Sequence, residues 1–80
     1  MTRTNAITAR RNFIKANANH AHIEAELMEA SEARMHAMRD GGPDTMAAEV
    51  ARLRGELADA TREVADARSK YFDALAADLA

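Results

Sequence analysis

The sequence contains no cysteine and no tryptophan, and its 80 residues include one proline, three glycines and three aromatic side chains. Without cysteine the chain has no disulfide, no thiolate metal site and no thiol nucleophile. No apolar run reaches the length of about eighteen residues that a membrane span needs, so we expect none. No apolar segment follows Met1, so we expect no secretory signal and a cytoplasmic or virion location.

Large apolar side chains are also scarce. Residues of the hydrophobic class make up 48% of the chain, but 20 of them are alanine. A domain this small buries a limited fraction of its surface, so with so little side-chain bulk it would be marginally stable alone. We therefore expect a partner: other copies of the chain, a larger protein assembly, or both.

The residues that interrupt helices lie together at the middle of the chain, from Asp40 to Asp44. A glycine such as Gly41 supplies the left-handed residue just past a helix, and proline is favoured at the first position of the next one. The pattern predicts an all-α fold, a single antiparallel two-helix hairpin over residues 1–80, coiled-coil-like. We expect helix one at about residues 4–40, a turn at 41–42 (Gly41, Gly42, then Pro43), and helix two at about 43–79 with Asp44 in its first turn.

The second predicted helix has a regular heptad pattern. With Val50 at position a, nine successive a and d positions are apolar: Met46, Val50, Leu53, Leu57, Ala60, Val64, Ala67, Tyr71 and Ala74. This is the spacing of a coiled-coil seam. Two copies of this helix could also pair in parallel, with Glu49 bridging to Arg54 and Glu63 to Arg68 of the partner.

The first predicted helix has a weaker seam, which His20 and Arg34 interrupt. Each helix also carries a second apolar line at position b, which widens the face to be buried beyond what two helices cover. The hairpin should therefore complete a four-helix or larger bundle with partner chains. The expected core and interface residues are Phe13, Ile23, Leu27, Met28, Met35, Val50, Leu53, Leu57, Val64, Tyr71 and Phe72.

The residues that could carry chemistry do not converge. His20 and His22 are about 200° apart around a helix, and no set of three or four metal ligands is apparent. His22 with Glu26 and Glu32 with His36 have the spacing of ordinary surface pairs. No glycine-rich phosphate loop is present, so we expect no catalytic residue, no cofactor, no metal and no small-molecule substrate.

Arg10, Arg11 and Lys15 form a basic cluster that could contact phosphate. In length and hairpin shape the chain resembles the plasmid-copy-control hairpin Rop. This resemblance implies a helical-hairpin dimer that binds nucleic acid through a basic face. The formal net charge of −2 and the pI near 5.9 argue against it, since phosphate binding favours a clearly basic surface. We expect these bases to pair instead with acidic residues, within the fold or between subunits, since the basic start lies beside Asp66, Asp73 and Asp78.

The sequence thus predicts a non-catalytic structural or assembly protein that acts through helix–helix contacts. Its alanine- and arginine-rich, lysine-poor composition suggests a GC-rich bacterial or phage genome, and an accessory subunit of a phage capsid or tail fits this description. The alternatives are a Rop-like nucleic-acid-binding hairpin dimer and a small regulator that binds one partner protein.

Overall fold

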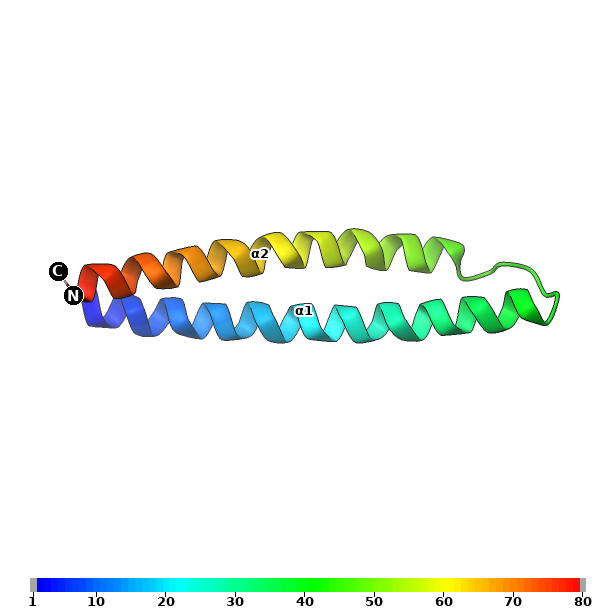
Figure 1. The fold of residues 1–80 in the computed structure, drawn as a ribbon, viewed down its shortest axis with the longest axis horizontal. Helices are drawn as coiled ribbons and strands as arrows, with labels where there is room; N and C mark the ends of the chain where they lie inside the picture. Colours follow the sequence, from blue (N-terminus) through cyan, green and yellow to red (C-terminus); the bar gives the residue numbers. More distant parts are fainter. Residues whose placement is uncertain (1, 80) are drawn as a thin grey trace.

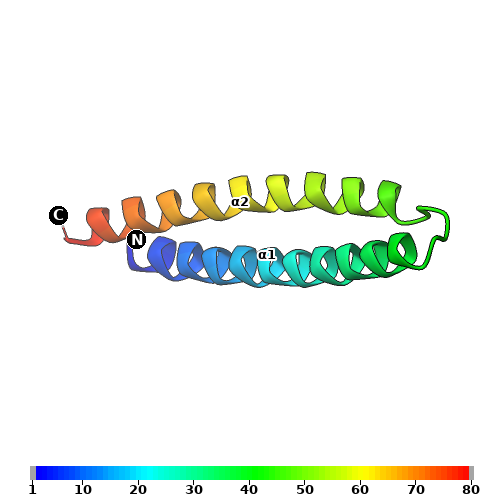
Figure 2. The same cartoon turned by 45° about the vertical axis from the view of Figure 1, so that its right-hand side comes forward.

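The chain forms two long helices joined by one turn. A computed structural model describes residues 2–79, with side chains from Asn5 to Leu79. Helix α1 spans Thr2–Arg39 and α2 spans Ala47–Leu79. The two run antiparallel and side by side (Figures 1 and 2), in a rod whose Cα trace measures 62 × 14 × 12 Å. The predicted all-α hairpin is confirmed.

The end of α1 has the hydrogen bonds of a Schellman motif. The amide of Gly42 donates to the carbonyl of Ala37 at 2.9 Å, and the amide of Gly41 donates to that of Met38 at 3.2 Å. Gly41 has φ of 77°, a conformation that residues with a Cβ adopt only under strain. Gly41 is therefore the residue that closes α1, as its place in the sequence predicts.

The predicted start of α2 is wrong. The helix begins at Ala47 rather than Pro43, and the first helical hydrogen bond runs from the amide of Val50 to the carbonyl of Met46, at 2.9 Å. The amide of Thr45 instead donates to the carbonyl of Pro43, only two residues earlier, which holds the backbone in a turn. Asp44 consequently lies in the connection between the helices and not in the first turn of α2.

The seam between the helices follows the heptad register of the sequence. Within the part of the chain whose side chains are described, every a and d position from Ala6 to Ala37 in α1 and from Val50 to Ala74 in α2 is buried or half-buried, and Asp78, the last a position of α2, is exposed. The fully buried large side chains are Val50 and Leu53, and Ala6, Ala30 and Ala60 are buried with them. Alanine lets the two helix axes approach closely, but it leaves the seam with little apolar bulk.

The seam of α2 packs against α1 of the same chain. Val50 and Leu53 are buried in one cluster with Ala30, and Leu27 and Met46 pack on it. Near the opposite end of the rod, the rings of Phe13 and Tyr71 lie 6.0 Å apart. The a and d residues of α2 therefore pack against α1 of the same chain, and not against a second, parallel copy of α2 as the heptad pattern also allowed.

Candidate interaction surface

The antiparallel arrangement gives the hairpin two unlike faces. In a heptad, positions e and b lie on one side of the seam and positions c and g on the other. Because the helices are antiparallel, the e and b rows of both helices share one face of the rod. The grooves between the helices agree with this: one is lined by Ser31, Met38 and Arg54, all at e positions. We call the face formed by the b and e rows the apolar face.

The apolar face holds all of the large hydrophobic side chains that are exposed in residues 5–79. Five of the eight come from α1 and three from α2, and their exposed fractions range from 36% to 90%. They are Ile7, Ile14, Met28, Met35, Met38, Phe72, Leu75 and Leu79. Since single exposed apolar residues are ordinary but a shared face of them is not, this row marks a surface for interaction.

The residues predicted as core and interface fall into two groups in the structure. Most lie in the seam, where Val50 and Leu53 are buried and Phe13, Ile23, Leu27, Leu57, Val64 and Tyr71 are half-buried. Met28, Met35 and Phe72 lie on the apolar face instead, and each is more than half exposed. The hairpin alone therefore leaves these three side chains in water.

The opposite face, which we call the acidic face, is formed by the c and g rows. Its helical charges are eight carboxylates against three bases, Lys15, Arg52 and Lys70. The carboxylates are Glu26, Glu29, Glu49, Glu56, Asp59, Glu63, Asp66 and Asp73. The acidic face has a formal charge of −5 and so differs sharply from the apolar face. The low net charge of the whole chain does not reveal that acidic and basic residues lie on different faces.

Ion pairs on the acidic face form within single helices. Arg52 donates to Glu49 and, at 2.7 Å, to Glu56. The hydrogen bond from Arg52 is the main cause that lowers the pKa of Glu49 below its ordinary 4.5, and the same pairing raises the pKa of Arg52. Glu49 also lies in the first turn of α2, where a negative charge complements the helix dipole.

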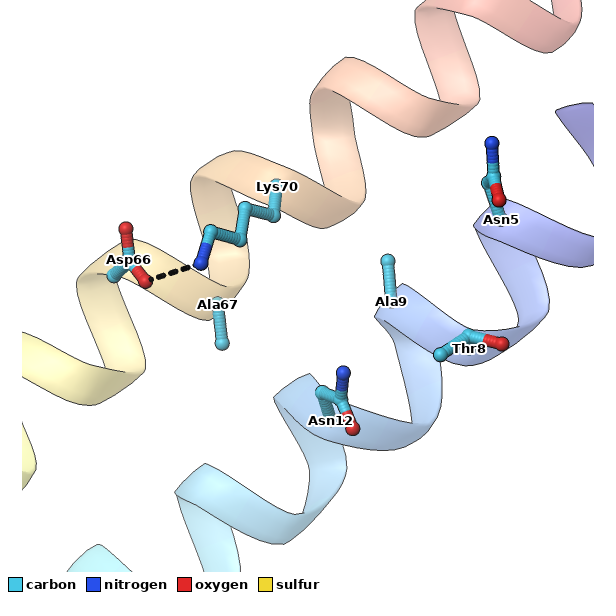
Figure 3. A pocket seen from close by; sticks show the side chains of 7 residues that line it. All are labelled: Asn5, Thr8, Ala9, Asn12, Asp66, Ala67 and Lys70. Carbon is cyan, nitrogen blue, oxygen red and sulfur yellow. Dashed lines mark ion pairs between the residues drawn. The ribbon is translucent and has the colours of Figure 1, made fainter.

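A groove with both polar and apolar walls runs between the helices on the acidic face near their terminal ends. It has a volume of about 310 Å³ and is lined by Asn5, Thr8, Asn12 and other residues of both helices. Figure 3 shows Lys70 at this groove, paired with Asp66 of the same helix rather than with α1; the two charged atoms lie 3.0 Å apart. The groove is open to solvent, and its amides and single ion pair form a solvated surface.

The structure does not gather the predicted basic cluster. Arg10, Arg11 and Lys15 occupy e, f and c positions, so their side chains leave α1 in three different directions. Among the described side chains no ion pair joins them to the acidic residues of α2, so the predicted pairing within the fold is wrong there. For Arg10 and Arg11 the reason is the segregation of charge onto faces, which sequence position along the chain does not show. Lys15 does lie on the acidic face, where it lines a groove together with Glu63 but forms no ion pair with it.

The histidines form isolated contacts. His22 Nε2 lies 2.5 Å from a carboxylate oxygen of Glu26, as the spacing predicts. His36 accepts a hydrogen bond from Arg39 at 2.8 Å, in place of the predicted pairing with Glu32. In residues 5–79 no three potential ligands among His, Asp and Glu lie together in a way that could hold a metal ion.

Neither helix, over the residues described, is both long and apolar enough to cross a membrane. Comparisons of the chain with protein-family models, with curated proteins and with solved structures found no match.

Proposed function

We propose that this chain is a non-catalytic assembly protein that acts by docking helices on its apolar face. The observation that carries the proposal is the gathering of all eight exposed large hydrophobic residues, within the described side chains, on one face of the rod. Among the described side chains, the seam alone fully buries only two large ones, Val50 and Leu53. Covering the apolar face would add the hydrophobic stabilisation that the seam lacks.

The total exposed surface supports the same conclusion. The chain exposes 5945 Å², whereas a compact globular protein of 8.7 kDa exposes about 4,700 Å². The excess, roughly 1,200 Å², is of the order that one partner buries in a specific protein complex. A rod this thin gains the surface burial of a globular domain only by joining other helices.

Composition and shape support one kind of assembly. An accessory subunit of a large assembly, such as a phage capsid or tail, is the role that we infer from the alanine- and arginine-rich composition and the rod 62 Å long. A hairpin of this length can bridge neighbouring subunits through one continuous face.

The proposal is tested by measuring the mass of the chain, by sedimentation, before and after mixing with extract of its source cells or with purified virions. We expect the wild-type chain to enter a complex and a variant with Ile14, Met35 and Phe72 changed to glutamine to remain at 8.7 kDa. These side chains are exposed, so the variant should keep its helicity. A control with Glu29, Asp59 and Glu63 changed to glutamine or asparagine should still enter the complex. A wild-type chain that stays at 8.7 kDa in every mixture would contradict the proposal.

Nucleic-acid binding stays a prediction from the sequence. It is tested by measuring RNA and DNA binding of the wild type over a range of salt concentrations. A complex that weakens steeply with salt, and that is lost when Arg10, Arg11 and Lys15 are changed to glutamine, would support it. We expect no such complex, because the acidic face repels phosphate along the length of the rod.

A further inference from the structure

The charges on the apolar face are mainly positive. Within residues 5–79 its e rows contain Arg10, Arg54 and Arg68 against one acid, Glu24, a formal charge of +2. The neighbouring f rows, at the back of each helix, add Arg11, Arg39 and Arg62 against Glu32, a further +2. The exposed apolar side chains are therefore bordered by arginines, and the carboxylates are concentrated on the other face.

The arginines of the apolar face are available to a partner. Among the described side chains, no ion pair engages Arg10, Arg54 or Arg68, whereas Arg52 and Lys70 on the acidic face are both paired. The guanidinium of Arg68 lies 5.7 Å above the ring of Phe72, so it stands beside the apolar surface rather than away from it.

Two hollows on this side of the molecule combine apolar and cationic walls. One, of about 410 Å³, is lined by Met35, Met38 and Arg54. The other, of about 350 Å³, is lined by Phe72, Arg68 and Asp73. Each hollow can accept an apolar side chain while the adjacent arginine binds a carboxylate.

A second copy of this chain fits this face poorly. Two apolar faces brought together would place the arginines of one copy against those of the other, and like charges removed from water are costly. The acidic face of a second copy offers the right charge but no apolar stripe. The occupant must therefore combine apolar side chains with carboxylates on one surface.

We propose that the apolar face binds one amphipathic helix of another protein, whose apolar stripe is bordered by aspartate and glutamate. This inference rests on the proposed function and names the chemistry of its partner. One hollow is lined by Met35. The other is lined by Phe72, which follows Tyr71, and Tyr71 lies against Phe13 of α1. Because Met35 is 22 residues beyond Phe13 on α1, the two hollows lie roughly 30 Å apart along the rod. A helix of about 20 residues therefore reaches both.

The test uses two synthetic helices of about four heptads with the same leucine and isoleucine stripe. One has glutamate at the bordering positions and the other has lysine, and both are titrated into the full chain by fluorescence anisotropy. We expect the glutamate peptide to bind about tenfold more tightly at about 0.1 M salt, and the preference to shrink at about 1 M salt.

The matched variants exchange charge on each face in turn. Arg54→Glu with Arg68→Glu should reverse the preference, because both arginines border the apolar face. Lys15→Glu with Lys70→Glu makes the same change of formal charge on the acidic face and should leave the preference as it is. Circular dichroism of each variant shows whether the helices remain.

The outcomes separate this inference from the proposed function. If both peptides bind equally, the face docks helices but the inferred partner chemistry is wrong. If neither binds, the proposed function itself fails. A dimer of the chain, found by sedimentation at the titration concentrations and dissociated by Met35→Lys, would make a second copy the occupant and overturn the inference. Binding to anionic phosphatidylglycerol vesicles without binding to the glutamate peptide would also overturn it.

Discussion

Arg34 of α1 and Asp44 of the connecting segment form a bidentate ion pair across the turn. Arg34 Nε donates to both carboxylate oxygens, at 3.2 and 3.0 Å, and Nη2 lies 3.0 Å from Oδ2. Arg34 occupies a seam position where the heptads of α1 call for an apolar side chain. Asp44, which lies outside α2, is the partner of Arg34. The ion pair therefore joins the polar residue that interrupts the seam of α1 to the segment that precedes the late start of α2.

Removing this pair should destabilise the hairpin by a small amount. We expect Asp44→Asn to lower the free energy of unfolding by about 0.5 to 1 kcal/mol, since the pair is partly exposed but bidentate. A double-mutant cycle with Arg34→Gln, followed by urea unfolding, measures the coupling between the two side chains. Additive effects would mean that the ion pair does not hold the turn.

The cost of shortening seam leucines should follow their burial. Leu53 is only 1% exposed and Leu57 is half-buried, so Leu53→Ala should cost about 2 to 5 kcal/mol and Leu57→Ala less. Leu79, which is 90% exposed, provides the control, and its change to alanine should leave the isolated chain unaltered. Thermal unfolding followed by circular dichroism ranks the three variants. Equal losses at residues 53 and 79 would place the seam elsewhere.

Two glycines should respond to alanine in opposite ways. Gly41 has a positive φ, so Gly41→Ala should destabilise the chain by about 1 kcal/mol. Gly55 lies within α2, and a Cβ placed there meets nothing within 4 Å. Gly55→Ala should therefore stabilise the chain by up to about 1 kcal/mol. Denaturant midpoints of the two variants measure the signs, and a stabilising change at Gly41 would show that the Schellman turn is absent.

The pairing of Glu49 with Arg52 predicts a dependence of stability on pH. Because the pKa of Glu49 is lowered in the folded chain, its contribution is complete above the ordinary value of 4.5 and is lost as pH falls through the folded value. An NMR titration of the Glu49 carboxyl carbon should give a pKa below 4.5 in the wild type. Arg52→Gln should raise that pKa, because it removes the hydrogen bond from the guanidinium. An unchanged titration in the variant would assign the shift to the helix dipole alone.

The sequence predicted the seam well because a heptad repeat records which side of each helix is apolar. Val50 and Leu53 stand in that repeat, and Gly41 marks the end of α1 by a backbone conformation that few other residues adopt. The start of α2 was not predictable in the same way, because Pro43 and Asp44 fit the first turn of a helix by local preference. Asp44 instead pairs with Arg34, ten residues earlier, and local patterns do not record that contact.

The two faces were predictable only in part. The sequence shows two separate apolar lines, one at the b positions of each helix. The line of helix one includes Met28 and Met35, and that of helix two includes Phe72. Their union on one face depends on the antiparallel packing, and so does the separation of arginines from carboxylates. Residue order places Arg10 near Asp73 in the hairpin, yet the heptad rows carry the two side chains to opposite faces.

The most direct test of the apolar face as a docking surface is NMR of methionine methyl groups labelled with ¹³C. Met28, Met35 and Met38 lie on that face, and Met46 lies in the seam beside Val50 and Leu53 and serves as an internal reference. On addition of the glutamate-bordered peptide, the methyl signals of Met28, Met35 and Met38 should shift or broaden while that of Met46 stays in place. Signals of Met28, Met35 and Met38 that do not move at saturating peptide would contradict the assignment of this face.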